Sequence, residues 1–230
     1  MKAYFIPGLG ADSRVFKNIS LPENFSPIYL EWLLPESDES LETYALRMGE
    51  KIDATEPFVL IGLSFGGMIA IEISKTKPPA ELVLISTIHV SNELPVLYKV
   101  AGKCRLHKLI PVKFFKRASL IKRIFTTETR EDKTLLKKMI RSSDPKFIKW
   151  AINAILNWKN DVIPDHCVHI HGSSDEILPI KYTHPTHIIN QGAHLMVITR
   201  AEEINRILAE ELAKVIFELQ RQEGTKQHKG

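Results

Sequence analysis

The amino-acid sequence predicts an α/β fold: a doubly wound, mainly parallel sheet of about six strands, with helices on both faces and an inserted helical cap. Two observations predict it. Short apolar runs alternate with helical stretches in the first 89 residues and again after residue 158, as they do in parallel sheets. Between these parts, residues 90–158 show helical periodicity only. The length of 230 residues suits one domain with a substantial core.

The elements before the cap follow from apolar runs, caps and breakers. We expect strands at residues 2–6, 26–32, 57–61 and 81–86, and helices at 12–20, 40–53 and 68–74. The short helix at 12–20 can be capped by Asp12 or Ser13. Each strand precedes a helix or a turn, so the run is typical of βαβ units.

The predicted cap contains two apolar stripes, at 120–125 and 135–140, and a helix opened by Asp144-Pro145. After it we expect strands at 167–171 and 186–189 and an amphipathic helix at 201–220. The predicted organisation is therefore a core at 1–89 and 159–222, a cap at 90–158 and a frayed tail at 223–230.

The segment Gly62-Leu63-Ser64-Phe65-Gly66-Gly67 joins an expected buried strand to an expected buried helix. A serine between glycines on such a turn is the nucleophile-elbow pattern. The turn is so sharp that a Cβ at Gly62 or Gly66 would clash with other backbone. We therefore predict that Ser64 is a nucleophile held at the tip of the sheet, beside a helix N-terminus that favours developing negative charge.

A serine nucleophile needs a base to take its proton and an acid to orient that base. In elbow folds the chain order is serine, acid, histidine, with each partner after a later strand. Asp175 and His194 follow the last two expected strands, so we predict the set Ser64, Asp175 and His194. Other candidates precede the acid, sit beside it, lie in mid-strand or lie in the tail: His169, His171, His187, His228, Glu176, Asp161 and Asp165.

Acyl chemistry also needs hydrogen-bond donors for an oxyanion. The predicted donors are the backbone N–H of Phe65, next to the serine, and that of Leu9, in the loop after the first strand. The Gly8-Leu9-Gly10 triplet is an incomplete dinucleotide fingerprint, because residue 13 is serine, not glycine, and no Asp or Glu closes a second strand at the right distance. No phosphate-binding G-K-[ST] loop occurs either, so a nucleotide cofactor is not expected.

These motifs resemble the α/β-hydrolase superfamily over nearly the whole chain. The matching pieces are residues 7–10, 62–67, 172–175 and 192–194. The resemblance implies a sheet that begins with what is normally the third strand, and a cap inserted after the sixth that covers the serine. The chain departs from the family pattern at Pro7-Gly8, where members often have His-Gly.

The net charge of +4 hides an asymmetry. Residues 99–150 hold 16 Lys or Arg against 4 Asp or Glu, a net +12, so the rest of the chain carries −8. Such a cap can attract an anionic substrate or partner: a CoA thioester, an acyl carrier protein or an anionic membrane surface. The alternative is a merely solvated face of amphipathic helices. Nucleic acid is not an expected partner, because no recognised binding motif is present.

We conclude that the sequence predicts a serine hydrolase that cleaves a small carboxylic ester or thioester through an acyl-enzyme on Ser64. Two alternatives stay open: a lyase or C–C bond hydrolase using the same three residues, and a hydrolase-like ligand-binding protein with little turnover. The residue set supplies its own base and oxyanion donors, so neither a metal nor a cofactor is expected.

The composition is typical of soluble globular proteins. No apolar stretch approaches the roughly 20 residues of a membrane span, and the N-terminus lacks a signal-peptide pattern. Cys104 and Cys167 lie in different expected elements, which suits reduced thiols and predicts a cytoplasmic protein. The oligomeric state is left open.

Overall fold

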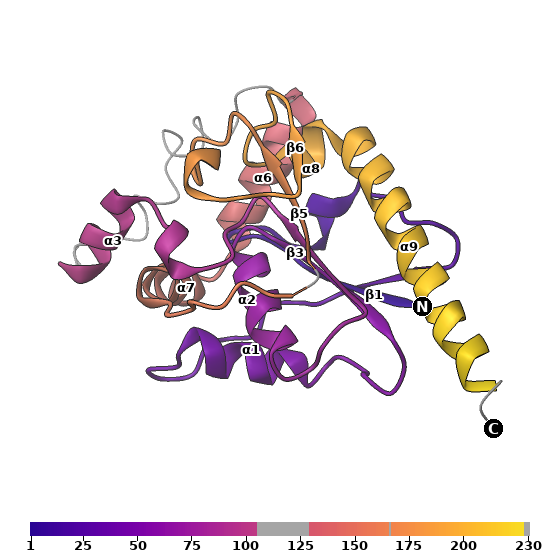
Figure 1. The fold of residues 1–230 in the computed structure, drawn as a ribbon. Coiled ribbons are helices and arrows are strands. Elements are labelled where there is room, and N and C mark those ends of the chain that lie inside the picture. The colour runs from indigo at the N-terminus through magenta and orange to yellow at the C-terminus, as the bar shows by residue number, and fades with distance from the viewer. Residues whose placement is uncertain (105–128, 166, 228–230) are drawn as a thin grey trace.

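The computed structural model describes residues 1–104, 129–165 and 167–227, and one parallel sheet organises them (Figure 1). The strand order is β2-β1-β3-β4-β5-β6, and every neighbouring pair is parallel. The strands are β1 Lys2–Ile6, β2 Ser26–Tyr29, β3 Phe58–Leu63, β4 Glu81–Ile85, β5 Cys167–Gly172 and β6 His187–Ile189. The order reverses between β1 and β3, so the predicted doubly wound α/β class is confirmed.

Helices cover both faces of the sheet, as predicted (Figure 1). One face carries α1 (Leu41–Gly49), α2 (Phe65–Ser74) and α7 (Pro145–Asn157). The other carries η1 (Ser13–Phe16), α6 (Arg130–Ser142), α8 (Met196–Thr199) and α9 (Ala201–Gln227). Alternate strand residues face the two layers: in β3, Leu60 belongs to one core cluster and Ile61 to the other. A strand buried on both faces explains the continuous apolar run.

The described part of the predicted cap consists of η2 (Ser91–Glu93), α3 (Val96–Lys103), α6 and α7. Leu136 and Met139 of α6 join the core cluster on one face, whereas Phe147 and Ala151 of α7 join the cluster on the other. The two long helices of this region are thus packed into the core layers. The apolar stripe at 120–125 lies outside the described residues.

Several element bounds differ from the sequence expectation. β2 ends at Tyr29, three residues early, since the chain then leaves the sheet and the Trp32 Nε1–H donates to the Ala11 carbonyl at 2.8 Å. The expected helix at 12–20 is a single turn, η1, with Asp12 as its cap. α1 ends at Gly49, and α2 begins directly after Ser64.

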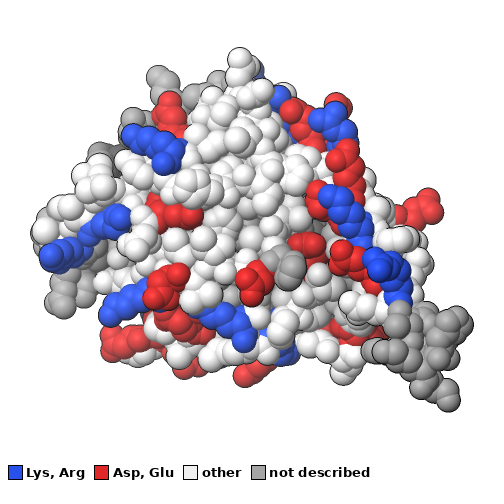
Figure 2. All heavy atoms as spheres, viewed as in Figure 1, with Lys and Arg blue, Asp and Glu red and all other residues white. Residues whose placement is uncertain are grey.

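The helix α9 extends to Gln227, beyond the expected end at residue 220, so part of the predicted frayed tail is helical (Figure 1). Its exposed side carries both charge signs in alternation (Figure 2). Within the described residues, no helix is long and apolar enough to cross a membrane.

Candidate active site

The turn between β3 and α2 places Ser64 at the carboxyl edge of the sheet in a strained conformation, with φ 53° and ψ −118°. A Cβ at Gly62 would lie 2.5 Å from the Gly66 carbonyl oxygen, so only glycine fits there. Two hydrogen bonds with neighbouring segments hold this conformation. Ser64 N–H donates to the Ile85 carbonyl at 2.8 Å, and the Thr87 hydroxyl donates to the Ser64 carbonyl at 2.7 Å.

The structure brings the three predicted residues, Ser64, His194 and Asp175, into one hydrogen-bonded line. His194 Nε2 lies 2.9 Å from Ser64 Oγ, and His194 Nδ1 lies 2.7 Å from Asp175 Oδ2. The other carboxylate oxygen, Oδ1, accepts from the backbone N–H groups of Ile177 and Leu178, each at 2.9 Å. Since the carboxylate can only accept, Nδ1 carries the proton and Nε2 is left to accept one from serine.

The electrostatics keep the acid ionised. Burial of Asp175 would raise the pKa of its carboxyl, but the charge and hydrogen bond of His194 and the Leu178 N–H outweigh burial. The pKa of Asp175 therefore lies below its ordinary value. An ionised carboxylate in this position can fix the imidazole tautomer and would stabilise an imidazolium if the ring accepted a proton.

Two glycines allow the loops that carry the acid and the base to cross. A Cβ on Gly172 would lie 2.5 Å from the carbonyl carbon of Gly192, with the oxygen nearer still. The loops are also joined by hydrogen bonds: the Ser174 N–H donates to the Gly192 carbonyl at 2.9 Å, and the Gln191 N–H to the Ser173 hydroxyl at 2.8 Å. This crossing joins the two loops next to Asp175 and His194.

The two predicted oxyanion donors lie at the same edge. Phe65 is the first residue of α2, so its N–H has no partner within the helix. Leu9 belongs to the loop after β1, and in the described part of the chain its N–H donates no hydrogen bond. The neighbouring Gly8 is in contact with the elbow, because a Cβ on it would lie 3.5 Å from Ser64 Cβ.

Sequence reasoning missed two buried histidines that lie close to Asp175. His169 and His171, set aside because they precede Asp175, are buried side chains on β5, and His171 Nε2 lies 3.4 Å from Asp175 Oδ2. Their spacing of two residues on a strand indicates a shared face. Ser64, His194 and Asp175 are joined by the two hydrogen bonds described above, and Asp161 and Asp165, also set aside, take part in neither of them. Within the described residues, no group of three or more His, Cys, Asp or Glu side chains could hold a metal ion.

Comparisons with known proteins bear on the fold. Neither a family model nor a curated protein matches the sequence. Solved structures do match, including a thermophilic esterase from Thermogutta terrifontis (TM-score 0.68, 18% identity, 94% of this chain and 90% of that one). MenH from S. aureus matches with TM-score 0.71 and 16% identity over 94% of both chains.

A third match is Est816, described as an N-acyl homoserine lactone degrading enzyme (TM-score 0.69, 16% identity, 90% of this chain and 92% of that one). The strand order, the turn at Ser64 and these structural similarities together show that the chain has the α/β-hydrolase fold. Likeness at this identity establishes the architecture, and the chemistry has to be argued from the site.

Proposed function

We propose that this protein is a serine hydrolase that cleaves a small carboxylic ester or thioester through an acyl-enzyme on Ser64. One observation carries the proposal: His194 lies 2.9 Å from Ser64 Oγ and 2.7 Å from Asp175. Both distances are within the range that general-base activation of serine requires. Structural neighbours that include esterases and a lactone-degrading enzyme support a reaction at an ester carbonyl.

The steps follow from the positions of the atoms. His194 Nε2 takes the Ser64 proton as Oγ attacks the carbonyl carbon of the substrate. The resulting oxyanion accepts hydrogen bonds from the backbone N–H groups of Leu9 and Phe65. The intermediate collapses and expels the alcohol or thiol, which takes the proton from His194. Water then attacks the acyl-enzyme with His194 again as base, which releases the carboxylic acid and restores Ser64.

A fluorophosphonate probe tests the nucleophile, with Ser64→Ala as the control. We expect the probe to label the wild-type protein and not the variant, and the wild type to turn over p-nitrophenyl esters. Equal labelling of the two proteins would refute the assignment. If the probe labels Ser64 but p-nitrophenyl esters of varied chain length are not turned over, the alternatives are favoured: a lyase or C–C bond hydrolase, or a ligand-binding protein.

We further propose an anionic acyl substrate, CoA-linked or carrier-linked, on the basis of the basic segment 99–150. Its described cations, which include Lys133, Lys137 and Lys138, lie on or beside α3, α6 and α7. Seven others lie outside the described residues: Arg105, Lys108, Lys113, Lys116, Arg117, Lys122 and Arg123. For a CoA thioester, kcat/KM should fall steeply with added salt, and for a neutral ester it should stay flat. Equal salt dependence would refute the anionic substrate.

The cytoplasm is the proposed location. Cys104 and Cys167 are both free thiols in the structure, which suits a reducing compartment. Fractionation of cells that express the native chain should recover it with cytoplasmic markers, and recovery with a membrane or extracellular fraction would contradict the proposal.

A further inference from the structure

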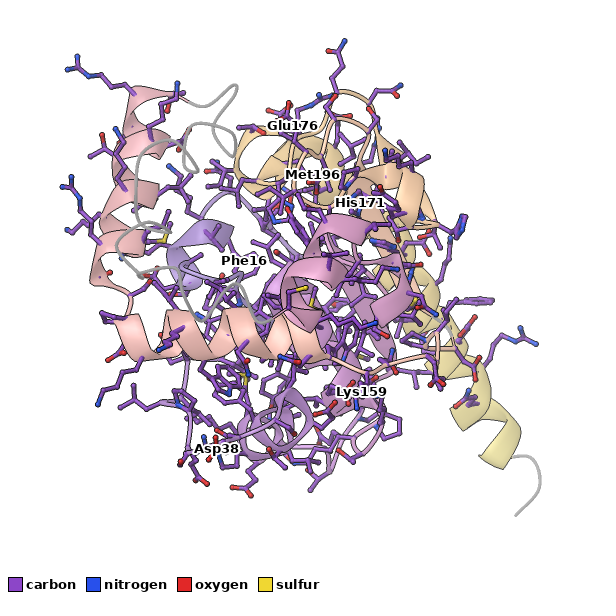
Figure 3. The ribbon with its side chains drawn as sticks, turned by 90° about the vertical axis from the view of Figure 1, so that its left-hand side faces the viewer. Phe16, Asp38, Lys159, His171, Glu176 and Met196 are labelled. Carbon is purple, nitrogen blue, oxygen red and sulfur yellow. The ribbon has the colours of Figure 1, made fainter. Side chains whose placement is uncertain are left out.

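Three buried imidazoles outside the Ser64 site, His89, His169 and His171, form a continuous row that we term the histidine file. His169 and His171 project from the same face of β5, and His89 lies in the segment after β4. The rings of His89 and His169 pack perpendicular to each other with centroids 4.4 Å apart, and those of His169 and His171 do so at 5.2 Å. Figure 3 shows His171 at the same end of the molecule as Glu176, which follows the predicted acid.

The file ends on Asp175. His171 Nε2 lies 2.7 Å from the Leu178 carbonyl oxygen and 3.4 Å from Asp175 Oδ2, the oxygen that also pairs with His194. Both neighbours are pure acceptors, so Nε2 carries a proton. The Leu178 N–H in turn donates to Asp175 Oδ1. His171 therefore holds the loop 175–178 by donating to the Leu178 carbonyl, while the N–H of the same residue holds the Asp175 carboxylate.

A hydrogen bond from the next ring fixes the tautomer of His171. His171 Nδ1 lies 3.2 Å from His169 Nε2, and a single proton fits between the two nitrogens. Burial lowers the pKa of His171, so it is neutral and its Nδ1 bears a lone pair. The shared proton then belongs to His169 Nε2. His169 is then neutral, and its buried Nδ1 makes no well-aligned hydrogen bond in the described residues, although the Thr87 backbone beside the ring acts to raise its pKa.

The far end of the file keeps the middle ring neutral. His89 forms a buried pair with Glu93, with its backbone N–H 2.6 Å and its Nδ1 3.4 Å from the two carboxylate oxygens. Burial opposes the charge on His89, but hydrogen bonds to Cys167 and Glu93 raise its pKa to about 9. Burial and the positive charge of His89 lower the pKa of His169 to about 2. The other ionisable groups that act on His171 are Asp175, His194 and Glu93.

We propose that His171 is a positioning residue for Asp175, and that His169 holds it in the Nε2–H tautomer this task requires. The inference rests on the proposed function, because it assigns a role to His171 through the acid of that site. The imidazole donates to the Leu178 carbonyl of the acid loop, and its Nε2 lies near Asp175 Oδ2, the oxygen that also pairs with His194, so both rings contact this carboxylate. Loss of the donor lets the carboxylate turn away from His194, which lowers the rate of the chemical step while substrate binding is unchanged.

Two conservative variants separate this role from simple core packing. In His171→Gln the amide nitrogen reaches the position of Nε2, whereas in His171→Asn it reaches only the position of Nδ1. We expect kcat for p-nitrophenyl acetate to fall by about 100-fold in H171N and by less than about tenfold in H171Q, as for an acid displaced by about 1 Å. KM should change little in both. His184→Asn, at an exposed histidine, is the matched control and should leave kcat unchanged.

Proton NMR of the resting protein provides a readout without substrate. The downfield resonance of the His194 Nδ1–H should persist in H171Q and be lost or moved upfield in H171N. Equal loss of kcat in both variants, or an unchanged resonance in H171N, would overturn the proposal. If the wild type shows neither turnover nor Ser64 labelling, the proposed function fails, and the resonances of the two variants still decide the role of His171.

Discussion

Gly172→Ala should separate the two loops that carry Asp175 and His194. An alanine Cβ at this position would lie 2.5 Å from the Gly192 carbonyl carbon, and real Cβ atoms essentially never approach a heavy atom within 3.0 Å. The loops must therefore move apart by at least 0.5 Å to relieve that contact, and further to relieve the one with the oxygen. Backbone stands on both sides of the clash, so no side-chain rotation can absorb the change.

We expect Gly172→Ala to lower both kcat and the free energy of unfolding. Because a displacement of about 1 Å in a catalytic group costs about 100-fold, the smaller shift here should lower kcat by at least about tenfold. Overpacking at a tight backbone crossing typically costs about 1–3 kcal/mol of unfolding free energy. Steady-state hydrolysis of p-nitrophenyl acetate and urea unfolding measure the two effects on one preparation.

Gly49→Ala is the matched control for this substitution. It changes the last residue of α1, where a Cβ would meet only Ile73 side-chain atoms at 3.5 and 3.6 Å, an ordinary contact. That variant should keep wild-type kcat and gain up to about 1 kcal/mol of stability. Wild-type kcat and stability in Gly172→Ala would show that the crossing does not set the geometry of the acid and base.

Three further predictions follow from single contacts. Thr87→Val keeps the side-chain shape and removes the hydroxyl that donates to the Ser64 carbonyl at 2.7 Å. Urea unfolding should show a loss of about 1 kcal/mol, and unchanged stability would contradict a role for this bond. Trp150→Phe removes the 2.7 Å hydrogen bond from Nε1 to the Glu39 carbonyl, which ties α7 to the loop before α1. The free energy of unfolding should fall by about 1 kcal/mol, and an unchanged value would argue against that attachment. Burial and repulsion from Glu211 raise the pKa of the Glu81 carboxyl in the folded protein to about 7. Protonation of Glu81 therefore stabilises the folded state fully below the unfolded pKa of about 4.5, and this stabilisation is lost as the pH rises through 7. Glu81→Gln should therefore raise the melting temperature relative to wild type more at pH 8 than at pH 5, and an equal effect at both would contradict the shift.

The sheet and the three aligned residues could be predicted because each depends on local sequence. Strand 58–63 is a buried β-branched run, and the elbow around Ser64 is a turn that only its glycines permit. Chain order then placed Asp175 and His194, since the carboxyl ends of parallel strands share one edge.

Features that depend on tertiary contact could not be predicted. Apolar spacing showed that α6 and α7 are amphipathic, but it did not show that they pack on opposite faces of the sheet. The role of His171 depends on the fold of the loop at 175–178, and the need for glycine at 172 depends on Gly192, which is 20 residues away. Contacts of this kind leave no periodicity in a single sequence.

The proposed acyl-enzyme on Ser64 is the central claim, and an acid quench during turnover tests it. The wild-type protein is mixed with a p-nitrophenyl ester, quenched in acid during turnover, digested and mapped by mass spectrometry. We predict that the peptide containing Ser64 gains one acyl group, and that Ser64→Ala gives neither the adduct nor turnover. Sustained turnover with no acyl group on Ser64, or an adduct on another residue that remains in Ser64→Ala, would contradict the account.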